Sequence, residues 1–471
     1  MALSTVADDI MRRAEQFGDS VTEALFEPVI RLGVTGLARA GKTVFITSLV
    51  ANLLDRGRMP GLAAAQEGRI EAAFLQPQPD DTVPRFDYET HLGRLTGPAP
   101  SWPDSTRAVS ELRLSLRVRP RGLLAGMQGL RTVHLDIVDY PGEWLLDLAL
   151  LELSYDQWAD QMLGRLDKRA SAQGFMERAR AADPTAPHDE GQARDLAQYF
   201  TRALHLARDD GMARCTPGRF LLPGDLDGSP VLTFAPIPYD APSRRGTLHR
   251  EMQRRYEAYK SKVVKPFFRD HFARIDRQVV LVDTLGALHA GPQALEDLRQ
   301  GMAEILGAFR PGRAARLTRL LGGKRVEKIL FAATKADHLH HLQHPRLTAI
   351  MEAMMRDAQD RARFAGAQTQ ALSLAALRAT TEEMRSHLGR DLGCVRGRLL
   401  DTGKDTACYP GALPEDPAHL LSPARDGAQG WLDADYQIMR FAPAPLTLQP
   451  GDGPPHIRLD RAAQFLIGDR L

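Results

Sequence analysis

The sequence has few cysteines and almost no net charge. Its three cysteines, Cys215, Cys394 and Cys408, lie far apart and lack the close spacing of paired metal ligands. A sparse, odd-numbered set argues against a disulfide-stabilised scaffold and favours a reducing compartment. The formal net charge of +2 among 471 residues gives no overall reason to expect nucleic acid as a partner.

Long apolar runs are missing as well. No stretch reaches the roughly 20 apolar residues that a transmembrane helix requires. Residues 1–21 carry acidic side chains early and contain no continuous apolar segment, which is unlike a secretory signal. We therefore expect a cytoplasmic protein without a transmembrane segment, for which contact with a membrane surface stays open.

The sequence does contain enough apolar residues for a core, since 43% of its residues are hydrophobic. Short apolar runs predict strands near residues 29–36, 110–118, 132–139, 278–285, 328–337 and 369–377. Residues 53–105 read as irregular, and 229–238 reads as one extended piece among helices. The order predicts an α/β fold, with a GTPase-like P-loop NTPase sheet flanked by helices, a mainly helical insertion and a loop-rich C-terminal extension.

This reading divides the chain into five parts. We expect an N-terminal amphipathic helix in 1–27, two parts of the nucleotide-binding core in 28–144 and 278–380, a helical insertion in 145–277, and an extension packed on the core in 381–471.

The strongest motif is GLARAGKT at residues 36–43, which fits G-x-x-x-x-G-K-[ST] between a predicted strand and a predicted helix. Its glycines let the chain wrap closely around a phosphate, and amides at a helix N-terminus favour an anion. Lys42 would then reach the β and γ phosphates, and the Thr43 hydroxyl would ligate Mg²⁺. The loop residues expected to touch nucleotide are Gly36, Arg39, Ala40, Gly41, Lys42, Thr43 and Val44.

A second motif, D-x-x-G, begins at Asp139 after an apolar strand. In GTPases such a carboxylate holds Mg²⁺ through water, and the amide of the glycine, here Gly142, contacts the γ phosphate. Asp283 begins a rival D-x-x-G at another strand end. We favour Asp139, because the strand directly before it can pair with the switch segment.

A third motif, T-K-x-D, spans residues 334–337. Asp337 would accept hydrogen bonds from the two donors of guanine while the stem of Lys335 packs on the ring. Adenine lacks that donor pair, so the motif favours GTP over ATP. His338 would lie beside the base, and Ala376 or Leu377 would offer an amide to the guanine oxygen, unless this segment is simply a buried strand end.

With these motifs in order, the chain resembles the YcjX-like family of bacterial P-loop GTPases, a stress-associated group. The resemblance rests on segments spread from residue 36 to the last residue: GLARAGKT, WPDSTRAVSELRLSL, DYPGEWLLDL, FAATKADHL, ALRATTE and HIRLDRAAQFLIGDRL. It implies binding of GTP and GDP with Mg²⁺, slow hydrolysis and a cytoplasmic location.

The resemblance also implies that WPDSTR, at residues 102–107, is the switch I segment. Thr106 would ligate Mg²⁺, Ser105 and Arg107 would touch phosphate, and Trp102 would cover the nucleotide. The alternative, a loop packed by its tryptophan, stays open.

One departure concerns turnover. Many GTPases place a water-orienting glutamine after D-x-x-G, whereas this chain has Glu143. A carboxylate accepts a proton from water but repels the γ phosphate, so we expect slow hydrolysis, with Arg39 or Arg107 stabilising developing charge. The residues expected to act in hydrolysis are Arg39, Lys42, Thr43, Thr106, Gly142 and Glu143.

Two other features receive a plainer interpretation. Four histidines gather at His338, His340, His341 and His344, but no acid or cysteine partner is evident beside them, so a metal site is disfavoured. A basic run at 313–325 reads as a solvated helix face. The function expected is a GTP-hydrolysing switch acting on an unknown protein partner through the insertion; a nucleotide-binding scaffold with negligible turnover and an ATPase are the alternatives.

Overall fold

The computed structural model describes residues 27–37, 39–104, 106, 108–121, 129–239, 244–307, 326–364, 366–426 and 439–471. Four features of the sequence analysis lie outside these residues: the expected N-terminal helix, Ser105, Arg107 and the basic run at 313–325.

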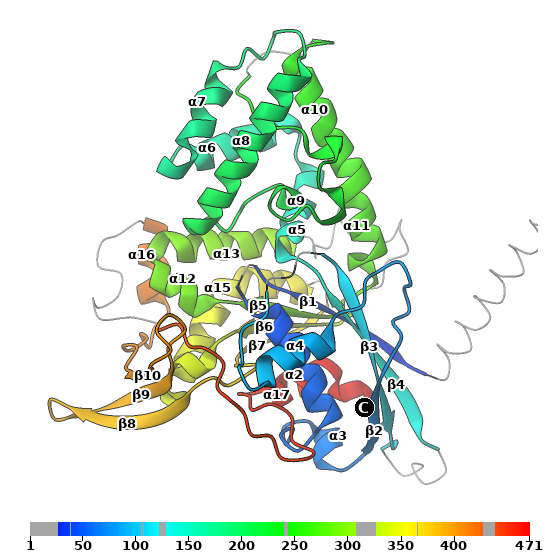
Figure 1. Cartoon of the computed structure of the whole chain (residues 1–471), viewed down its shortest axis with the longest axis vertical. Helices are drawn as coiled ribbons and strands as arrows, with labels where there is room; N and C mark the ends of the chain where they lie inside the picture. Colours follow the sequence, from blue (N-terminus) through cyan, green and yellow to red (C-terminus); the bar gives the residue numbers. More distant parts are fainter. Residues whose placement is uncertain are drawn as a thin grey trace, which may run out of the picture.

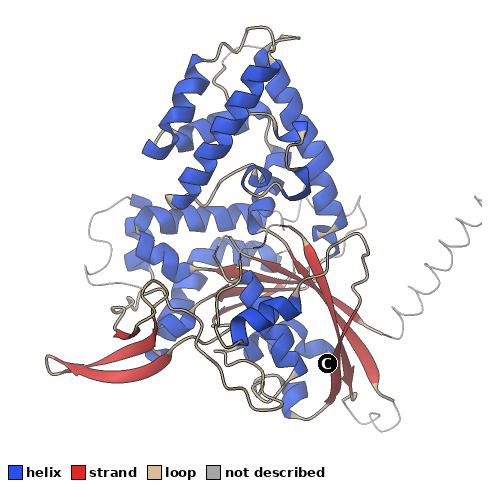
Figure 2. Cartoon of the chain, in the orientation of Figure 1, coloured by secondary structure: helices blue, strands red, loops and turns tan. Residues whose placement is uncertain are grey.

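A seven-stranded sheet forms the centre of the molecule (Figure 1, Figure 2). Its strands lie in the order β2-β3-β4-β1-β5-β6-β7. Five of them, from β4 to β7 in this order, run parallel, while β3 is antiparallel to β4 and β2 is antiparallel to β3. The strands are β1 (Val29–Thr35), β2 (Ile70–Gln76), β3 (Ser110–Val118), β4 (Arg131–Asp139), β5 (Arg277–Val282), β6 (Lys328–Ala333) and β7 (Gln368–Ser373).

Both faces of the sheet are buried. Alternate residues of β5 enter two separate apolar clusters: Val279 and Leu281 join one, and Val280 and Val282 join the other. This follows from the two-residue period of a strand, and it explains why the parallel strands read as continuous apolar runs. The observed architecture confirms the predicted α/β class, a mostly parallel sheet flanked by helices as in P-loop GTPases.

One strand was not predicted. The stretch 53–105 contains β2, together with α3 (Ala63–Gln66) and α4 (Tyr88–Thr96). The sequence of β2, IEAAFLQ, contains two alanines, one glutamate and one glutamine, and its one β-branched residue is isoleucine. This composition does not favour a strand. Its strand conformation comes from antiparallel pairing with β3 at the sheet edge.

Helices follow β4 and rise above the sheet (Figure 1). Their core is aromatic: Trp158 stacks on Tyr256 with ring centroids 5.0 Å apart, and Phe234 packs edge-on against both. The segment expected to be extended, 229–238, forms the 3₁₀ turn Pro230–Leu232 and no strand. The helices are α5 (Gly142–Leu146), α6 (Tyr155–Leu166), α7 (Gln173–Ala181), α8 (Glu190–Asp209), α9 (Gly218–Leu221), α10 (Leu248–Tyr259) and α11 (Lys265–Asp270).

Helix α15 (His344–Phe364) packs against β6 and β7, α13 (Pro292–Gly307) packs against α15, and α12 (Thr284–Ala290) packs against α13. Helix α2 (Lys42–Leu54) packs against β1. The last part of the chain, residues 381–471, is called the tail below. It contains α16 (Ala418–Asp426) and, near its end, α17 (Leu459–Ile467), which packs against β5 and β6. Arg277 of β5 donates to the carbonyl of Leu466 at 3.1 Å. The final helix is therefore part of the core below the sheet.

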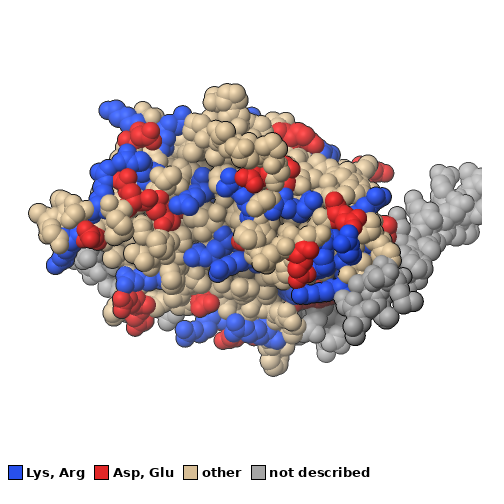
Figure 3. Space-filling model, turned by 90° about the horizontal axis from the view of Figure 1, so that it is seen from below, with Lys and Arg blue, Asp and Glu red and all other residues tan. Residues whose placement is uncertain are grey.

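The tail also contains a small antiparallel sheet that the sequence analysis did not predict. It consists of β8 (Thr381–His387), β9 (Arg390–Arg398) and β10 (Asp405–Cys408) in the order β10-β9-β8. The β8–β9 hairpin projects from the body (Figure 1). Acidic and basic side chains are interspersed on the face seen from below (Figure 3). Among the described residues no helix is long and apolar enough to cross a membrane.

Candidate functional site

The loop between β1 and α2, residues 36–43, has an unusual backbone. Arg39 and Gly41 both adopt left-handed conformations, with φ of 65° and 85°. A backbone that alternates in handedness gathers N–H groups into a concave, anion-binding surface. Lys42 folds back over this loop and donates to the carbonyl of Gly36 at 2.8 Å. The glycine loop thus combines a helix N-terminus with the Lys42 ammonium group, which is fixed over the loop by its hydrogen bond to Gly36.

Three oxygen-bearing side chains meet beside the glycine loop. Asp139 ends β4 and lies opposite Val34 of β1 in the sheet. Its Oδ2 accepts a hydrogen bond from the Thr106 hydroxyl at 2.9 Å, and that hydroxyl is 3.4 Å from the Thr43 hydroxyl. The residues come from three segments that are far apart in the sequence.

This oxygen cluster has a spare coordination position. Asp139 is buried, and its Oδ1 has no hydrogen-bond partner within the described part of the chain. Burial raises the pKa of Asp139 to about 6, while the charge of Lys42 opposes that rise. An unpaired buried carboxylate oxygen next to two hydroxyls is a donor set that suits a hard cation such as Mg²⁺. Thr43, Thr106 and Asp139 therefore fit the metal that the sequence implies.

The turn after Asp139 touches the glycine loop directly. A Cβ on Gly142 would overlap the carbonyl oxygen of Gly36, so only glycine allows this approach. Glu143 follows and is buried. Trp144 is fixed on the insertion side, because its Nε1 donates to the Leu222 carbonyl at 3.0 Å.

The T-K-x-D residues lie at the end of β6. Asp337 is buried, and its Oδ2 accepts from the Ala379 amide at 2.9 Å. Lys335 has a left-handed backbone, with φ of 61°, and forms an ion pair with Asp283. Asp283 also caps α12 by accepting from the Gly286 amide at 3.0 Å. The rival aspartate therefore contacts the lysine of this motif and a helix N-terminus, rather than the hydroxyls beside the glycine loop.

His338 follows Asp337 and is held by the tail. Its ring packs edge-on against Phe441, with centroids 5.3 Å apart. Burial lowers the pKa of His338, which keeps the ring neutral near pH 7. A neutral imidazole presents one donor and one acceptor, both of which suit a nucleoside.

One cavity of about 720 Å³ joins these groups. Ser105 and Arg107 lie outside the described residues, and the predicted residues Gly36, Asp139 and Gly142 do not line the cavity. Its size is within the range of small-molecule sites. The predicted residues that line it are Arg39, Ala40, Gly41, Lys42, Thr43, Val44, Trp102, Thr106, Glu143, Lys335, Asp337, His338, Ala376 and Leu377.

This chain is similar in sequence to known proteins along nearly its whole length. The model of the YcjX-like family, DUF463, matches residues 30–471. The chain belongs to the YcjX-like family. It is 40% identical to the Ras-like GTPase YcjX of Escherichia coli K12 over 94% of this chain and 96% of that protein. It is 35% identical to the Ras-like GTPase YcjX of Shewanella oneidensis over 98% of this chain and 99% of that protein.

The family resemblance seen in the motifs is thus confirmed, and this YcjX-like chain is related to GTPases. The cavity has further walls that the motifs did not reveal. From the tail come Leu400, Arg440 and Phe441, and from the insertion come residues such as Arg208 and Cys215. Trp102 is tied to the tail, since its Nε1 donates to the Phe441 carbonyl at 2.8 Å. No local pattern marks Phe441, because it belongs to a loop and meets Trp102 only in the folded chain.

Proposed function

We propose that this YcjX-like protein binds Mg²⁺–GTP in the cavity, hydrolyses it slowly to GDP, and acts as a nucleotide-dependent switch in a bacterial stress response. The observation that carries the proposal is that residues of the glycine loop and Asp337 line one and the same cavity, with the Thr43–Thr106–Asp139 oxygen cluster beside the loop. A phosphate-binding loop, an oxygen donor set for Mg²⁺ and a guanine-reading carboxylate are the three parts that GTP binding needs.

We assign a role to each residue on the basis of its position in this site. The amides of the glycine loop and the Lys42 ammonium would hold the phosphates, because both present positive charge at the loop. Thr43, Thr106 and Asp139 would hold Mg²⁺, which supplies charge neutralisation at the phosphate oxygens. Asp337 and Lys335 would bind guanine, with the amides of Ala376 and Leu377 close by in the same cavity.

The walls of the cavity would hold the nucleoside. Trp102 and His338 both line it, and both contact Phe441 of the tail. Aromatic faces stack well on a purine, so these side chains suit the base or ribose. Ser105 and Arg107 belong to the same segment as Trp102, and we assign them to the phosphates by position alone.

Slow hydrolysis follows from Glu143. This buried carboxylate lines the cavity where a water-orienting glutamine stands in many GTPases. It can accept a proton from an attacking water, but its charge opposes the phosphate in a low-dielectric cavity. Arg39 lines the same cavity and would offset developing negative charge.

The switch proposal rests on contacts between the Gly142 turn and the insertion. Trp144, two residues after Gly142, donates to Leu222 and is covered by the Arg219 guanidinium 3.3 Å from its ring centroid. Asp147 accepts from the Gly218 amide at 2.8 Å. If Gly142 moves when the γ phosphate is lost, the contacts of Trp144 and Asp147 would pass that movement to α9. We therefore assign the binding of a protein partner to the surface of the helical insertion, 145–277.

Single-turnover phosphate release from GTP tests hydrolysis, with Lys42→Ala as the inactive control. Limited proteolysis in GDP and in a non-hydrolysable GTP analogue tests the switch. We expect release of one phosphate per chain and two different protease patterns. No GTP consumption together with identical patterns would favour a scaffold with negligible turnover. Equal affinity for ATP and GTP, unchanged by Asp337→Ala, would overturn the assignment of Asp337 to guanine and leave an ATPase as the alternative.

We place the protein in the cytoplasm, consistent with its sparse cysteines. We also propose the five-part division as the domain organisation, with the nucleotide core in 28–144 and 278–380, the N-terminal helix in 1–27 and the extension in 381–471.

A further inference from the structure

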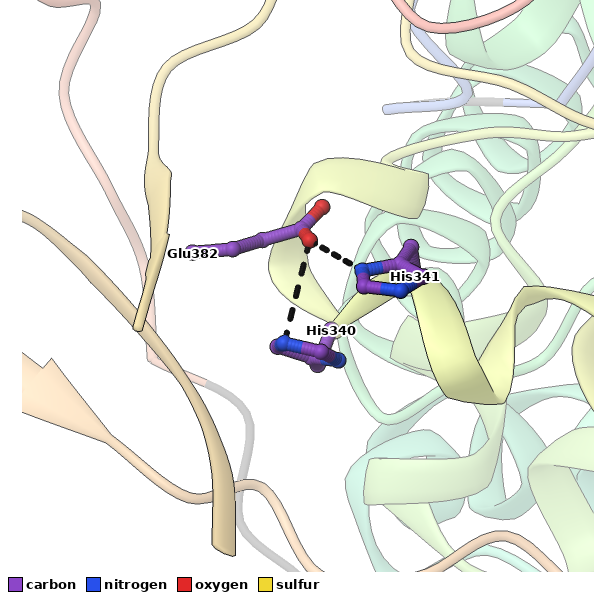
Figure 4. Close-up of side chains that lie close together, drawn as sticks. All are labelled: His340, His341 and Glu382. Carbon is purple, nitrogen blue, oxygen red and sulfur yellow. Dashed lines mark hydrogen bonds and ion pairs between the residues drawn. The ribbon is translucent and has the colours of Figure 1, made fainter. Parts of the chain in front are cut away.

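Outside the cavity, two adjacent histidines and a glutamate converge (Figure 4). His340 and His341 follow the T-K-x-D motif, while Glu382 lies near the start of β8. Their side chains point toward one another from these two segments (Figure 4). The acid that the histidine cluster lacks in the sequence is thus supplied by the fold.

The three ligand atoms are close enough to share one ion. His341 Nδ1 is 2.5 Å from Glu382 Oε2, His340 Nε2 is 3.8 Å from that same oxygen, and all three atoms lie within 4.8 Å of one another. Metal–ligand bonds of about 2.0–2.2 Å at tetrahedral angles place neighbouring ligand atoms roughly 3.3 Å apart. The observed spacings lie on both sides of that value, so enclosing an ion needs rotation of the exposed His341 and of the Glu382 carboxylate, while His340 stays in place.

We propose that His340, His341 and Glu382 form a Zn²⁺ site, with water in the fourth position. Two imidazoles and one carboxylate are a ligand set that Zn²⁺ accepts, whereas Mg²⁺ and Ca²⁺ prefer oxygen ligands throughout. None of the three residues lines the nucleotide cavity. The site is therefore distinct in position and chemistry from the oxygen cluster at Asp139.

The surroundings favour one carboxylate oxygen as the ligand. Arg378 Nη2 lies 3.4 Å from Glu382 Oε1, which orients the carboxylate and leaves Oε2 toward the histidines. His340 is buried and held in place, because a Cβ on Gly393 of β9 would come within 2.8 Å of its ring. The long contact from the Leu342 amide to His340 Nδ1, 3.4 Å, has to be released on binding, since a metal-bound neutral imidazole carries its proton on the other nitrogen.

Zinc at this position would cross-link two segments that already meet at Asp337. Ala379 and Thr380, just before Glu382, both donate to Asp337. An ion that joins His340 and His341 to Glu382 would fasten β8 to the loop after β6. It would therefore stabilise the folded protein whether or not nucleotide is bound.

The experiment uses the untagged full chain, stripped of metal with a chelator and dialysed. Zn²⁺ is titrated in competition with a chromogenic chelator under excess Mg²⁺, which saturates the oxygen cluster and separates this test from nucleotide binding. Co²⁺ in place of Zn²⁺ reports tetrahedral coordination through its visible absorption. We expect one ion per chain, a tetrahedral Co²⁺ spectrum and a rise in the thermal unfolding temperature with Zn²⁺.

His341→Ala is the main variant, because this side chain is exposed and we expect its loss to leave the fold intact. Glu382→Gln is the second, and His387→Ala, an exposed histidine of the same hairpin, is the matched control. We expect the two ligand variants to lose Zn²⁺ affinity by about 10–100-fold and the control to keep it. Equal Zn²⁺ affinity in all four proteins, or no Zn²⁺ bound by the wild type, would overturn the proposal and leave an ordinary ion pair between His341 and Glu382.

Discussion

Replacing Asp337 by Asn should change the base preference of the proposed site while keeping the hydrogen bond that holds this side chain in place. Asp337 Oδ2 accepts from the Ala379 amide at 2.9 Å, and an asparagine oxygen can still accept this bond. The other end of the side chain changes from an acceptor to an NH₂ donor. That donor would oppose the 2-amino group of guanine but would pair with the carbonyl oxygen that xanthine has at the same ring position, while the retained oxygen can still accept from N1–H.

The magnitude follows from the bonds that are exchanged. Hydrogen bonds to a charged group contribute about 1.5–3 kcal/mol each. Loss of the bond to the 2-amino group therefore costs about 1.5–3 kcal/mol, or roughly 10–150-fold in GDP affinity. Adenine makes no such bond, so ADP affinity should change little.

The assay is competition of GDP, XDP and ADP against a fluorescent GDP analogue, or against the matching XDP analogue for the variant. Asp283→Asn is the matched control, because Asp283 contacts Lys335 and the Gly286 amide, and asparagine also caps helices well. We expect that control to keep the preference for guanine.

Two results would refute the reasoning. One is an Asp337→Asn variant that still prefers GDP over XDP by the wild-type ratio. The other is a switch to XDP in Asp283→Asn, which would assign base recognition to the wrong aspartate. Thermal unfolding of each variant checks that the Ala379 contact has survived.

Two further predictions concern the turn after Asp139 and its link to the insertion. Gly142→Ala places a Cβ against the carbonyl of Gly36. We therefore expect GTP hydrolysis to fall by about 100-fold, and the protease patterns with GDP and with the GTP analogue to become the same. Gly164→Ala is the control, because the space around Gly164 is open, and we expect it to change neither result. Burial raises the pKa of Asp147 to about 7, so its contribution to stability is full at acidic pH, where the carboxyl is protonated, and is lost as pH rises toward 7. Asp147→Asn removes this titration, and its unfolding temperature should gain on the wild type between pH 5 and pH 8 by the equivalent of about 3 kcal/mol, because about two of the three units of the raised pKa lie in that window. A constant difference would contradict the buried, protonated carboxyl.

The sequence by itself determined the parts that contiguous residues build. The glycine loop needs only residues 36–43, whose glycines and lysine set the backbone and the charge locally. The parallel strands were predictable because burial on both faces makes them continuous apolar runs. The family also followed from motifs alone, since their order along the chain is a property of the sequence.

The tertiary structure decided what distant segments make together. β2 is a strand because β3 offers it an edge, not because its own residues favour one. Phe441 meets Trp102 across 339 positions, and Glu382 meets His341 across 41. Such contacts depend on how the sheet and its covering layers pack, and no local pattern records them. The glycine loop was therefore visible in the sequence, whereas the other residues that line its cavity and the acid beside the histidines appeared only in the fold.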